Sequence, residues 1–248
     1  MAHDTALDRR DFLRIIGSVG AFTLMSQFTS ACSPASERKP VNSTSVATAS
    51  GDAVQLPEPA KKGNVSVEEV LARRRSIRAY SGKALTLQEV SQLLWAGQGI
   101  TADWGGRVAP SAGALYPLEL YVAIGSVDDL SLGVYRYSPK LHQLDLMKHG
   151  DVREQLAAAA LGQSWMKDGA ICIIIAAVCE RTTGKYGDRG IRYVYIEAGH
   201  AAQNICLQAT ALNLGTVTVG AFVDDSVTEV VGLSRDEVPL YLLPVGRT

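Results

Sequence analysis

Arginine is concentrated in one short stretch of this 248-residue chain. Residues 73–78, R-R-R-S-I-R, place four guanidinium groups within six positions and add the hydroxyl group of Ser76. Guanidinium groups bind phosphate through two parallel hydrogen bonds, and a serine hydroxyl adds a further short donor. The run therefore indicates an anion-binding site, and the alternative is a basic edge that contacts only solvent.

A second set of polar residues lies inside the otherwise apolar stretch 187–214. Glu197, His200, Asn204 and Gln208 recur three or four positions apart, so in a helix they share one side. Buried polar groups need hydrogen-bond partners. This stripe either bonds to neighbouring backbone or faces a cofactor or a symmetry-related copy of the same helix.

Several common functional signatures are missing from the sequence. There is no dinucleotide-binding glycine pattern, no P-loop and no G-x-S-x-G nucleophile elbow. The four histidines are scattered, which gives no metal-ligand spacing. A formal net charge of −1 indicates no nucleic-acid partner. These observations argue against a Rossmann dehydrogenase, a P-loop enzyme, a serine hydrolase and a metal centre.

Capping and periodicity predict the elements that hold these residues. Capping boxes that begin at Ser66 and Thr86 predict helices to about residues 74 and 97. The glycine-rich loop 99–113 that follows lets backbone approach a ligand closely. Further along, we expect strands at 118–124, 133–137, 143–148, 170–178, 216–219 and 240–245, helices at 152–161 and 226–231, and a loop at 181–190.

The stretch 187–214 is predicted to be one long helix, because it contains no proline and has apolar residues at helical spacing. Cys206, Leu207, Ala211 and Leu214 add a second apolar patch. A helix that is apolar on most sides is buried. We therefore expect this helix to be buried.

The N-terminal residues predict an export signal. The pair Arg9-Arg10 precedes an apolar run, 15–28, and then Ala31-Cys32, a site of the kind that lipoprotein processing leaves for acylation. We expect a twin-arginine signal at 1–32, a disordered linker at 33–64 and one domain at 65–248, with a cytosolic protein carrying a chance Arg-Arg as the alternative. The twin-arginine route exports folded proteins, which favours a redox cofactor inserted before export.

Four motifs in order resemble the FMN-dependent nitroreductase superfamily over about residues 67–247. They are R-R-S-I-R at 74–78, P-S-A-G-A-L-Y-P-L-E-L-Y at 110–121, L-G-T-V-T-V-G-A-F at 214–222 and P-V-G-R at 244–247. The resemblance implies an α+β fold with a central, mostly antiparallel sheet flanked by helices, and a homodimer with the long helix at its interface. The residues implied to bind FMN are Arg74, Arg75, Ser76, Arg78, Ser111, Gly113, Val219, Gly220, Ala221 and Arg247.

Within that superfamily, the chain is similar to the SagB-type branch. Ala114 and Tyr116-Pro117 stand where simple nitroreductases have Asn and Gln-Pro, while K-Y-G-D-R-G at 185–190 and E-A-G-H-A-A-Q-N at 197–204 match the branch. The resemblance implies that Lys185 and Tyr186 are catalytic and remove a proton. A free lysine has a pKa of about 10.4, so such a base requires burial or a cationic neighbour such as Arg189.

The sequence thus predicts an exported FMN oxidoreductase that transfers hydride through flavin N5, acts on a small-molecule or peptide-derived substrate, and contacts the membrane only through its signal or lipid anchor. Backbone amides at Gly220 and Ala221 are expected to stabilise the reduced flavin. Two alternatives stay open: an NAD(P)H-dependent nitro or quinone reductase, and a non-catalytic flavin-binding lipoprotein.

Overall fold

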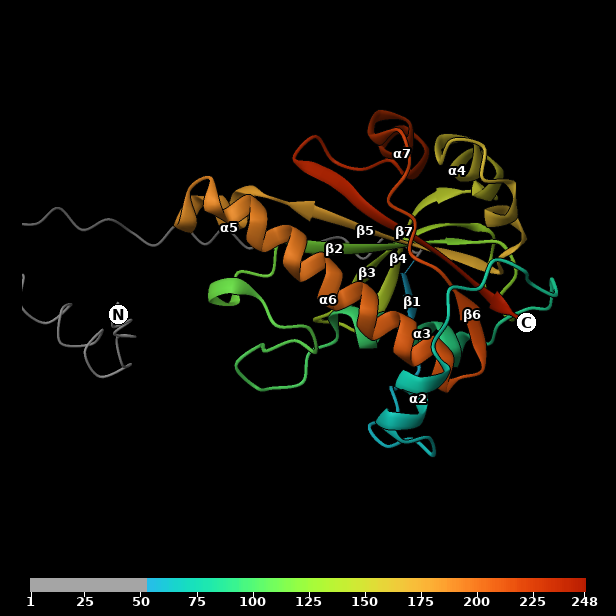
Figure 1. The fold of residues 1–248 in the computed structure, drawn as a ribbon. Coiled ribbons are helices and arrows are strands. Elements are labelled where there is room, and N and C mark those ends of the chain that lie inside the picture. The colour runs from blue at the N-terminus through green and yellow to red at the C-terminus, as the bar shows by residue number, and fades with distance from the viewer. Residues whose placement is uncertain (1–52) are drawn as a thin grey trace, which may run out of the picture. The chain divides into compact units, whose positions relative to one another are not determined.

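The computed structural model describes residues 53–248, which form one antiparallel sheet flanked by helices (Figure 1). The sheet has seven strands in the order β1-β4-β3-β2-β5-β7-β6, and each neighbouring pair is antiparallel. This is the expected α+β architecture. The strands are β1 (Ala53–Gln55), β2 (Leu118–Ile124), β3 (Gly133–Ser138), β4 (Gln143–His149), β5 (Ile171–Val178), β6 (Leu214–Thr216) and β7 (Glu237–Arg247).

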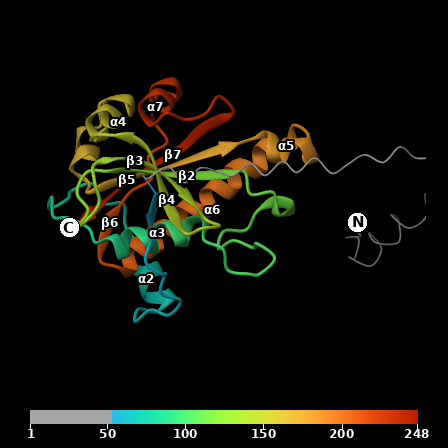
Figure 2. The same cartoon turned by 180° about the vertical axis from the view of Figure 1, so that it is seen from behind.

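Helices cover both faces of the sheet. In the two opposite views, α3 and α6 lie on one face and α4 and α7 on the other (Figures 1 and 2). No helix among the described residues is long and apolar enough to cross a bilayer. The helices are α2 (Val67–Arg73), α3 (Leu87–Gln98), α4 (Arg153–Ala159), α5 (Glu180–Tyr186), α6 (Arg189–Ala211) and α7 (Asp224–Val231), with 3-10 turns η1 (Ala112–Ala114) and η2 (Ser164–Asp168).

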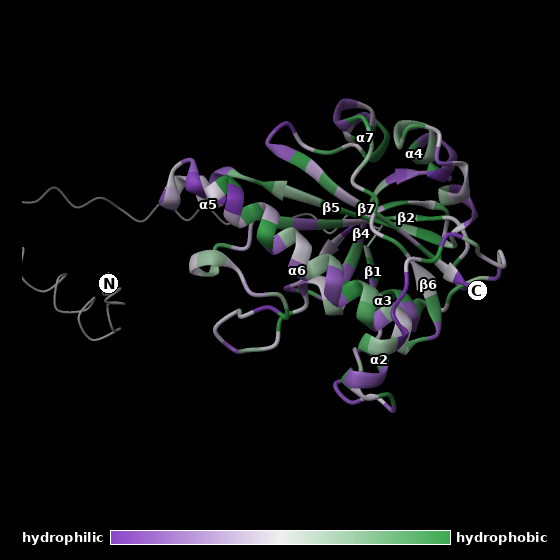
Figure 3. Cartoon of the chain, viewed as in Figure 1, coloured by the Kyte–Doolittle hydropathy of each residue, from purple (hydrophilic) through white to green (hydrophobic). Residues whose placement is uncertain are grey.

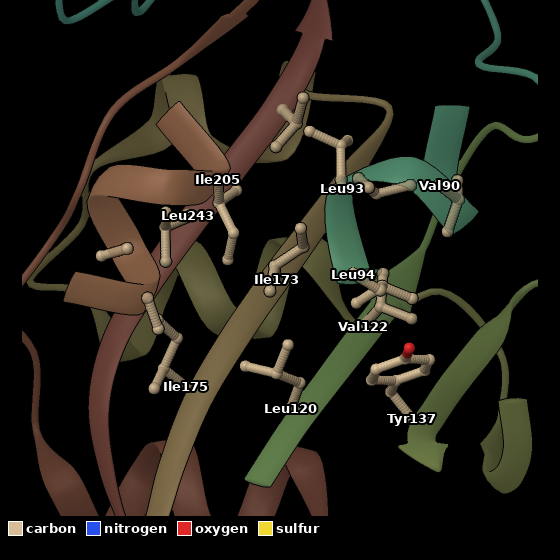
Figure 4. Close-up of a cluster of buried hydrophobic side chains, with 14 of the residues drawn as sticks. Val90, Leu93, Leu94, Leu120, Val122, Tyr137, Ile173, Ile175, Ile205 and Leu243 are labelled. Carbon is tan, nitrogen blue, oxygen red and sulfur yellow. The ribbon is translucent and has the colours of Figure 1, made fainter. Parts of the chain in front are cut away.

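Strand β5 shows how the apolar sequence fills both layers of the core. All eight of its residues are buried, and they alternate between the two faces. Ile173 and Ile175 belong to the cluster under α3 and α6, where Ile205 and Leu243 also lie (Figure 4). Ile174 belongs to the cluster under α4 and α7. Covering both faces explains why the strand is a continuous apolar run rather than an alternating one.

Ser66 and Thr86 begin two helices as predicted, but only Thr86 forms a complete capping box. The Glu89 amide donates to Thr86 Oγ1 at 3.2 Å, and the Thr86 amide donates to Glu89 Oε2 at 2.8 Å. At the start of α2, the Glu69 amide donates to Ser66 Oγ at 3.1 Å. Each bond satisfies an amide that the first helical turn leaves without a partner.

The segment 181–190 was expected to be a loop, and that expectation is wrong. Residues Glu180–Tyr186 form α5, which ends where the Gly187 amide donates to Thr183 O at 2.8 Å. Helix α6 begins at Arg189, and a Cβ atom on Gly190 in its first turn would lie 2.8 Å from the backbone of Thr183. Only glycine lets the two helices meet so closely.

The expected linker, 33–64, extends too far toward the domain. Strand β1 pairs with β4, and Leu56 after it is 3% exposed. Both the amide and the carbonyl group of Ala60 bond to the Gln92 side chain, at 2.7 and 3.0 Å. Polar composition alone did not reveal that a sheet edge and α3 would hold these residues. The rest of the linker and the signal at 1–32 lie outside the described residues.

Candidate active site

The arginine-rich run is fixed to the edge of the sheet beside β6. The Ile77 amide donates to Thr216 O at 2.9 Å, and these two segments run parallel. The Tyr80 hydroxyl donates to Ile77 O at 2.9 Å and to Pro244 O at 3.3 Å, and burial raises the pKa of this phenol. The backbone of the run is therefore held by two strands, while its side chains project from it.

Two of the four arginines in the run already have partners. Arg73 pairs with Glu69 at 2.9 Å and also donates to Asn213. Arg75 donates to the carbonyl groups of Ala72 and Arg74, at 3.0 and 2.7 Å. These contacts tie the two side chains to the end of α2 and to Asn213.

Arg74 and Arg78 are different. Within residues 53–248, neither guanidinium group forms an ion pair with a carboxylate. The Arg78 guanidinium lies 5.6 Å from the ring centre of Trp165 in η2. With the exposed Ser76 between them, these two side chains form the donor set that fits a phosphate group.

The segment after β6 reaches the same neighbourhood. Val219 exchanges two backbone hydrogen bonds with Leu242, at 2.8 and 3.0 Å. Gly220 and Ala221, which follow, are exposed, and within the described chain their amides donate to no protein acceptor. The carbonyl group of Ala221 accepts from Gln163, just before η2. Thus η2 and the residue before it connect this turn to Arg78, and the two exposed amides are available to a ligand bound there.

Arg247 makes contacts that the sequence did not predict. Its Nη2 donates to Glu89 Oε2 at 2.9 Å, and its Nε donates to Ala84 O at 3.0 Å. The side chain thus ties β7 to the start of α3. It is not grouped with the unpaired guanidinium groups of Arg74 and Arg78.

Lys185 and Tyr186 meet the glycine-rich loop at Gly113. This glycine has a φ of 64°, and a Cβ atom on it would lie 2.8 Å from Tyr186 Oη and 3.0 Å from Lys185 Nζ. Its neighbours Ala114 and Tyr116 also have positive φ, at 54° and 46°. Non-glycine residues in this region are uncommon, and such strain clusters at functional sites. The structure therefore brings three predicted site residues together.

A buried acid lies behind this loop. Glu197 is 2% exposed, and burial raises its pKa to about 7, although the Ser111 hydroxyl, as a hydrogen-bond donor, and the charge of Arg107 act in the opposite direction. Its Oε1 has no partner among the described residues. Sequence analysis singled out Glu197 but missed Arg107, which comes from the loop and carries no motif.

The rest of the polar stripe has other surroundings. His200 is exposed, whereas Asn204 and Gln208 line an apolar groove of about 550 Å³ between segment 60–65, α2, α3 and α6. Leu207 and Ala211 of α6 also line it. Figure 3 shows the mixed hydropathy along α6. Half of the predicted second apolar patch thus lines an open groove in a single chain, whereas its other two members, Cys206 and Leu214, are buried in the core.

The phosphate-type donors and the Lys-Tyr pair lie toward different ends of α6. Burial raises the pKa of the Cys206 thiol to about 11, and the positive charge of Arg74 acts in the opposite direction. Arg74 therefore lies near Cys206. Glu197, beside the loop, is nine residues earlier, which is roughly 13 Å along a helix. One chain therefore carries two separate halves of the predicted site.

The order of these features along the chain matches a known family. The sequence profile of the nitroreductase family matches residues 71–247. The chain belongs to the nitroreductase family. Nitroreductases are oxidoreductases that typically bind flavin and are commonly homodimers, and the two halves described above suit such a site.

Individual nitroreductase relatives agree with this. A nitroreductase-like protein of Methanocaldococcus jannaschii is 47% identical over 78% of this chain and 96% of its own length. A nitroreductase-like protein from Anabaena variabilis, known from a crystal structure, is 35% identical to this chain with a TM-score of 0.66. The match covers 73% of this chain and 38% of the Anabaena protein. Trifolitoxin operon protein TfxC of Rhizobium leguminosarum bv. trifolii is 28% identical over 79% of this chain and 60% of its own length.

Proposed function

We propose that this nitroreductase is an FMN-dependent oxidoreductase of the SagB type. One observation carries the proposal: Arg74 and Arg78 lack carboxylate partners, whereas Arg73 is paired, and η2 connects Arg78 to the turn at which the amides of Gly220 and Ala221 are free. A cluster of unpaired cations beside unpaired amides suits a ligand with a phosphate and a polar ring edge.

The residues divide the work of holding such a cofactor. Arg74, Ser76 and Arg78 would bind the phosphate and ribityl part, and the amides of Gly220 and Ala221 would donate to the ring edge. Bound FMN supplies the acceptance and return of a hydride at its N5 atom. Amide donors fixed before the reaction stabilise negative charge without reorganisation.

Lys185 and Tyr186 are the proposed proton-handling pair. Lys185 Nζ lies 5.5 Å from the ring centre of Tyr186, and that ring packs edge-on against Tyr193 at 5.2 Å. The tyrosine is thus held in place. Lys185 is exposed in the single chain and Arg189 lies over Tyr193, so the burial that a lysine base requires would have to come from a bound substrate or a second copy. A substrate beside Gly113 would lose a proton to this pair as its hydride leaves.

We also propose that the active molecule is a homodimer with FMN between subunits. The support is the groove along α3 and α6, whose apolar residues a monomer leaves in contact with water. A second copy packed there would bring its Gly113 loop toward the phosphate-binding arginines of the first. This would unite the two halves of the site.

The proposed place of action is outside the cytoplasm, after twin-arginine export, with Cys32 as the point of a lipid anchor. Support comes from the order Arg9-Arg10, apolar run and Ala31-Cys32 in the sequence. Residues 33–52 are proposed as the tether between anchor and domain. The substrate is proposed to be a small molecule or a peptide-derived compound, and the similarity to the trifolitoxin operon protein supports the branch.

The first measurement is the absorbance spectrum of the purified protein. Flavin bands that persist through gel filtration are the expected result. A folded, colourless protein that cannot be reconstituted with FMN would overturn the proposal. A screen of electron donors then separates the alternatives: rapid oxidation of NAD(P)H with a nitro or quinone acceptor would favour the nitroreductase activity that the name of the M. jannaschii relative indicates.

Substitution of the Lys-Tyr pair tests the third reading, a flavin-binding protein without catalysis. Lys185→Ala and Tyr186→Phe should each lower turnover at least tenfold while FMN stays bound. The matched control is Lys167→Ala. Lys167 lies in η2, and its ammonium group is 3.5 Å from the carboxylate of Glu154 in α4. Unchanged turnover in Lys185→Ala and Tyr186→Phe would contradict the role of the pair, and a flavin-bound wild-type protein with no turnover for any donor and acceptor would favour the non-catalytic role.

A further inference from the structure

Helix α5 carries the proposed Lys-Tyr pair at its end but has few contacts of its own to hold it. The helix is seven residues long, Cys179 before it forms no side-chain cap, and Thr182 is its only buried residue. Helices this short are not stable without tertiary contacts. The close corner at Gly190 holds one end of α5, so the other end needs a contact elsewhere in the chain.

Arg181 makes that contact in the first turn of α5. Its Nη1 donates to Glu119 Oε1 at 2.6 Å and to the carbonyl group of Tyr116 at 3.1 Å. One guanidinium nitrogen carries two hydrogens, so it can serve both acceptors. Glu119 belongs to β2 and is 8% exposed, which anchors the ion pair on the sheet. Arg181 therefore joins α5 both to β2 and to the end of loop 107–116.

Tyr116 is the residue at which the contacts of this loop meet. It has a positive φ of 46°, which few non-glycine residues adopt without support from their surroundings. Its amide donates to Ser111 Oγ at 2.9 Å, and its hydroxyl group accepts the Arg107 amide at 3.2 Å. A donor to its carbonyl group thus holds the loop at the residue on which its other contacts depend.

The loop and α5 meet a second time at the proposed site. A Cβ atom on Gly113 would lie 2.8 Å from Tyr186 Oη and 3.0 Å from Lys185 Nζ, so the two segments are in close contact there. Both views show the loop, drawn in green, beside α5 (Figures 1 and 2). Loss of the contact at the start of α5 would let the pair move relative to Gly113.

We propose that Arg181 is a positioning residue that clamps α5 to loop 107–116 and so holds Lys185 and Tyr186 against Gly113. The importance of that placement for catalysis rests on the proposed function, whereas the clamp itself is a property of the fold. Within residues 53–248, the hydrogen bonds of the Arg181 side chain end on Glu119 and on the carbonyl group of the loop. Arg181 therefore acts on the pair through the helix.

The same carboxylate offers a matched control. Arg136 Nη2 lies 3.0 Å from Glu119 Oε2, and its side chain is 39% exposed, against 38% for Arg181. Arg136 comes from β3 rather than from α5. Replacement by methionine keeps a long unbranched side chain and removes every N–H donor. Arg136→Met and Arg181→Met thus each take one arginine from Glu119, and only the second also releases α5.

Hydrogen exchange in the full chain without added flavin tests the clamp. Because Arg181 is partly exposed, its loss should loosen two segments locally rather than unfold the domain. In Arg181→Met, the amides of Gly187 in α5 and Tyr116 in the loop should exchange about tenfold faster, and that of Gly232 after α7 should not change. Arg136→Met should exchange like wild type at all three amides.

A conservative variant and turnover separate positioning from plain stabilisation. Arg181→Lys still has donors for both acceptors and should restore most of the protection. In flavin-loaded enzyme, Arg181→Met should lower kcat about tenfold with KM and FMN affinity near those of wild type, because the pair is displaced while the binding groups remain. Arg136→Met should keep the wild-type kcat.

Four results overturn the proposal: unchanged exchange in Arg181→Met, equal loosening in Arg136→Met, no recovery in Arg181→Lys, or fast exchange with wild-type kcat. The exchange readout needs no flavin. A colourless protein in which Arg181→Met exchanges fast would therefore defeat the proposed function alone. An active, flavin-bound protein in which this variant exchanges like wild type would defeat the clamp alone.

Discussion

Single residues in this nitroreductase show how the same side-chain type takes different roles. Arg73 and Arg247 are engaged by Glu69 and Glu89, whereas Arg74 and Arg78, in the same run as Arg73, have no carboxylate partner within residues 53–248. The sequence could indicate an anion site from the density of arginine. It could not tell which guanidinium groups were free, because the partners come from helices and strands elsewhere in the chain.

Replacing an unpaired arginine should weaken FMN binding far more than replacing a paired one. Hydrogen bonds to charged groups contribute about 1.5–3 kcal/mol, so Arg74→Ala or Arg78→Ala should raise the Kd for FMN about 10- to 100-fold. Arg73→Ala, the neighbour paired with Glu69, is the control and should change it little. Fluorescence titration of apoprotein with FMN measures all three, and equal effects would contradict the assignment.

Titration of the buried Glu197 should make the free energy of unfolding depend on pH. Its raised pKa makes the folded state lose stability as pH rises from about 4.5 to 7, by up to about 3 kcal/mol. Glu197→Gln removes this loss, so its unfolding free energy relative to wild type should grow over that range and then stay constant. Urea denaturation at several pH values measures the difference, and a pH-independent difference would show that the carboxyl group does not titrate as stated.

At the scale of elements, local signals predicted most of the fold. The capping boxes at Ser66 and Thr86 and the apolar run of β5 became the elements expected, because each is determined by neighbours in sequence or by a simple periodicity. Helix α5 and strand β1 were missed. Both are short, and tertiary contacts rather than propensity hold them, as the β1–β4 pairing shows. The Arg107–Glu197 proximity was invisible for the same reason.

The corner between α5 and α6 gives a sharp test of close packing. Gly190→Ala would place a methyl group 2.8 Å from the backbone of Thr183, which should cost about 1–3 kcal/mol. Gly184→Ala in α5 meets nothing within 4 Å and should be neutral or stabilising by about 1 kcal/mol, since alanine favours helix. Thermal unfolding compares the two variants. A Gly190→Ala protein as stable as wild type would mean that α5 and α6 can move apart to accept the methyl group.

At the scale of the whole molecule, the groove along α3 and α6 is where a second copy is proposed to pack. Leu207→Asp should convert a dimer to a monomer and reduce bound flavin together with it, because each site would lose the partner's loop. Leu161→Asp, which changes a leucine that is 66% exposed after α4, should alter neither property. Light scattering with flavin absorbance measures both, and a flavin-loaded monomer would contradict the shared site.

The place of β7 in the sheet has a consequence for synthesis of the protein. This strand lies between β5 and β6, so β5 gains its second neighbour only after α5, α6 and α7 have been translated. Pairing so distant in sequence is slow, and until it occurs β5 presents an apolar edge that can pair with other chains. Nascent chains that stall before β7 should therefore aggregate or need a chaperone, because the edge of β5 stays unpaired in them.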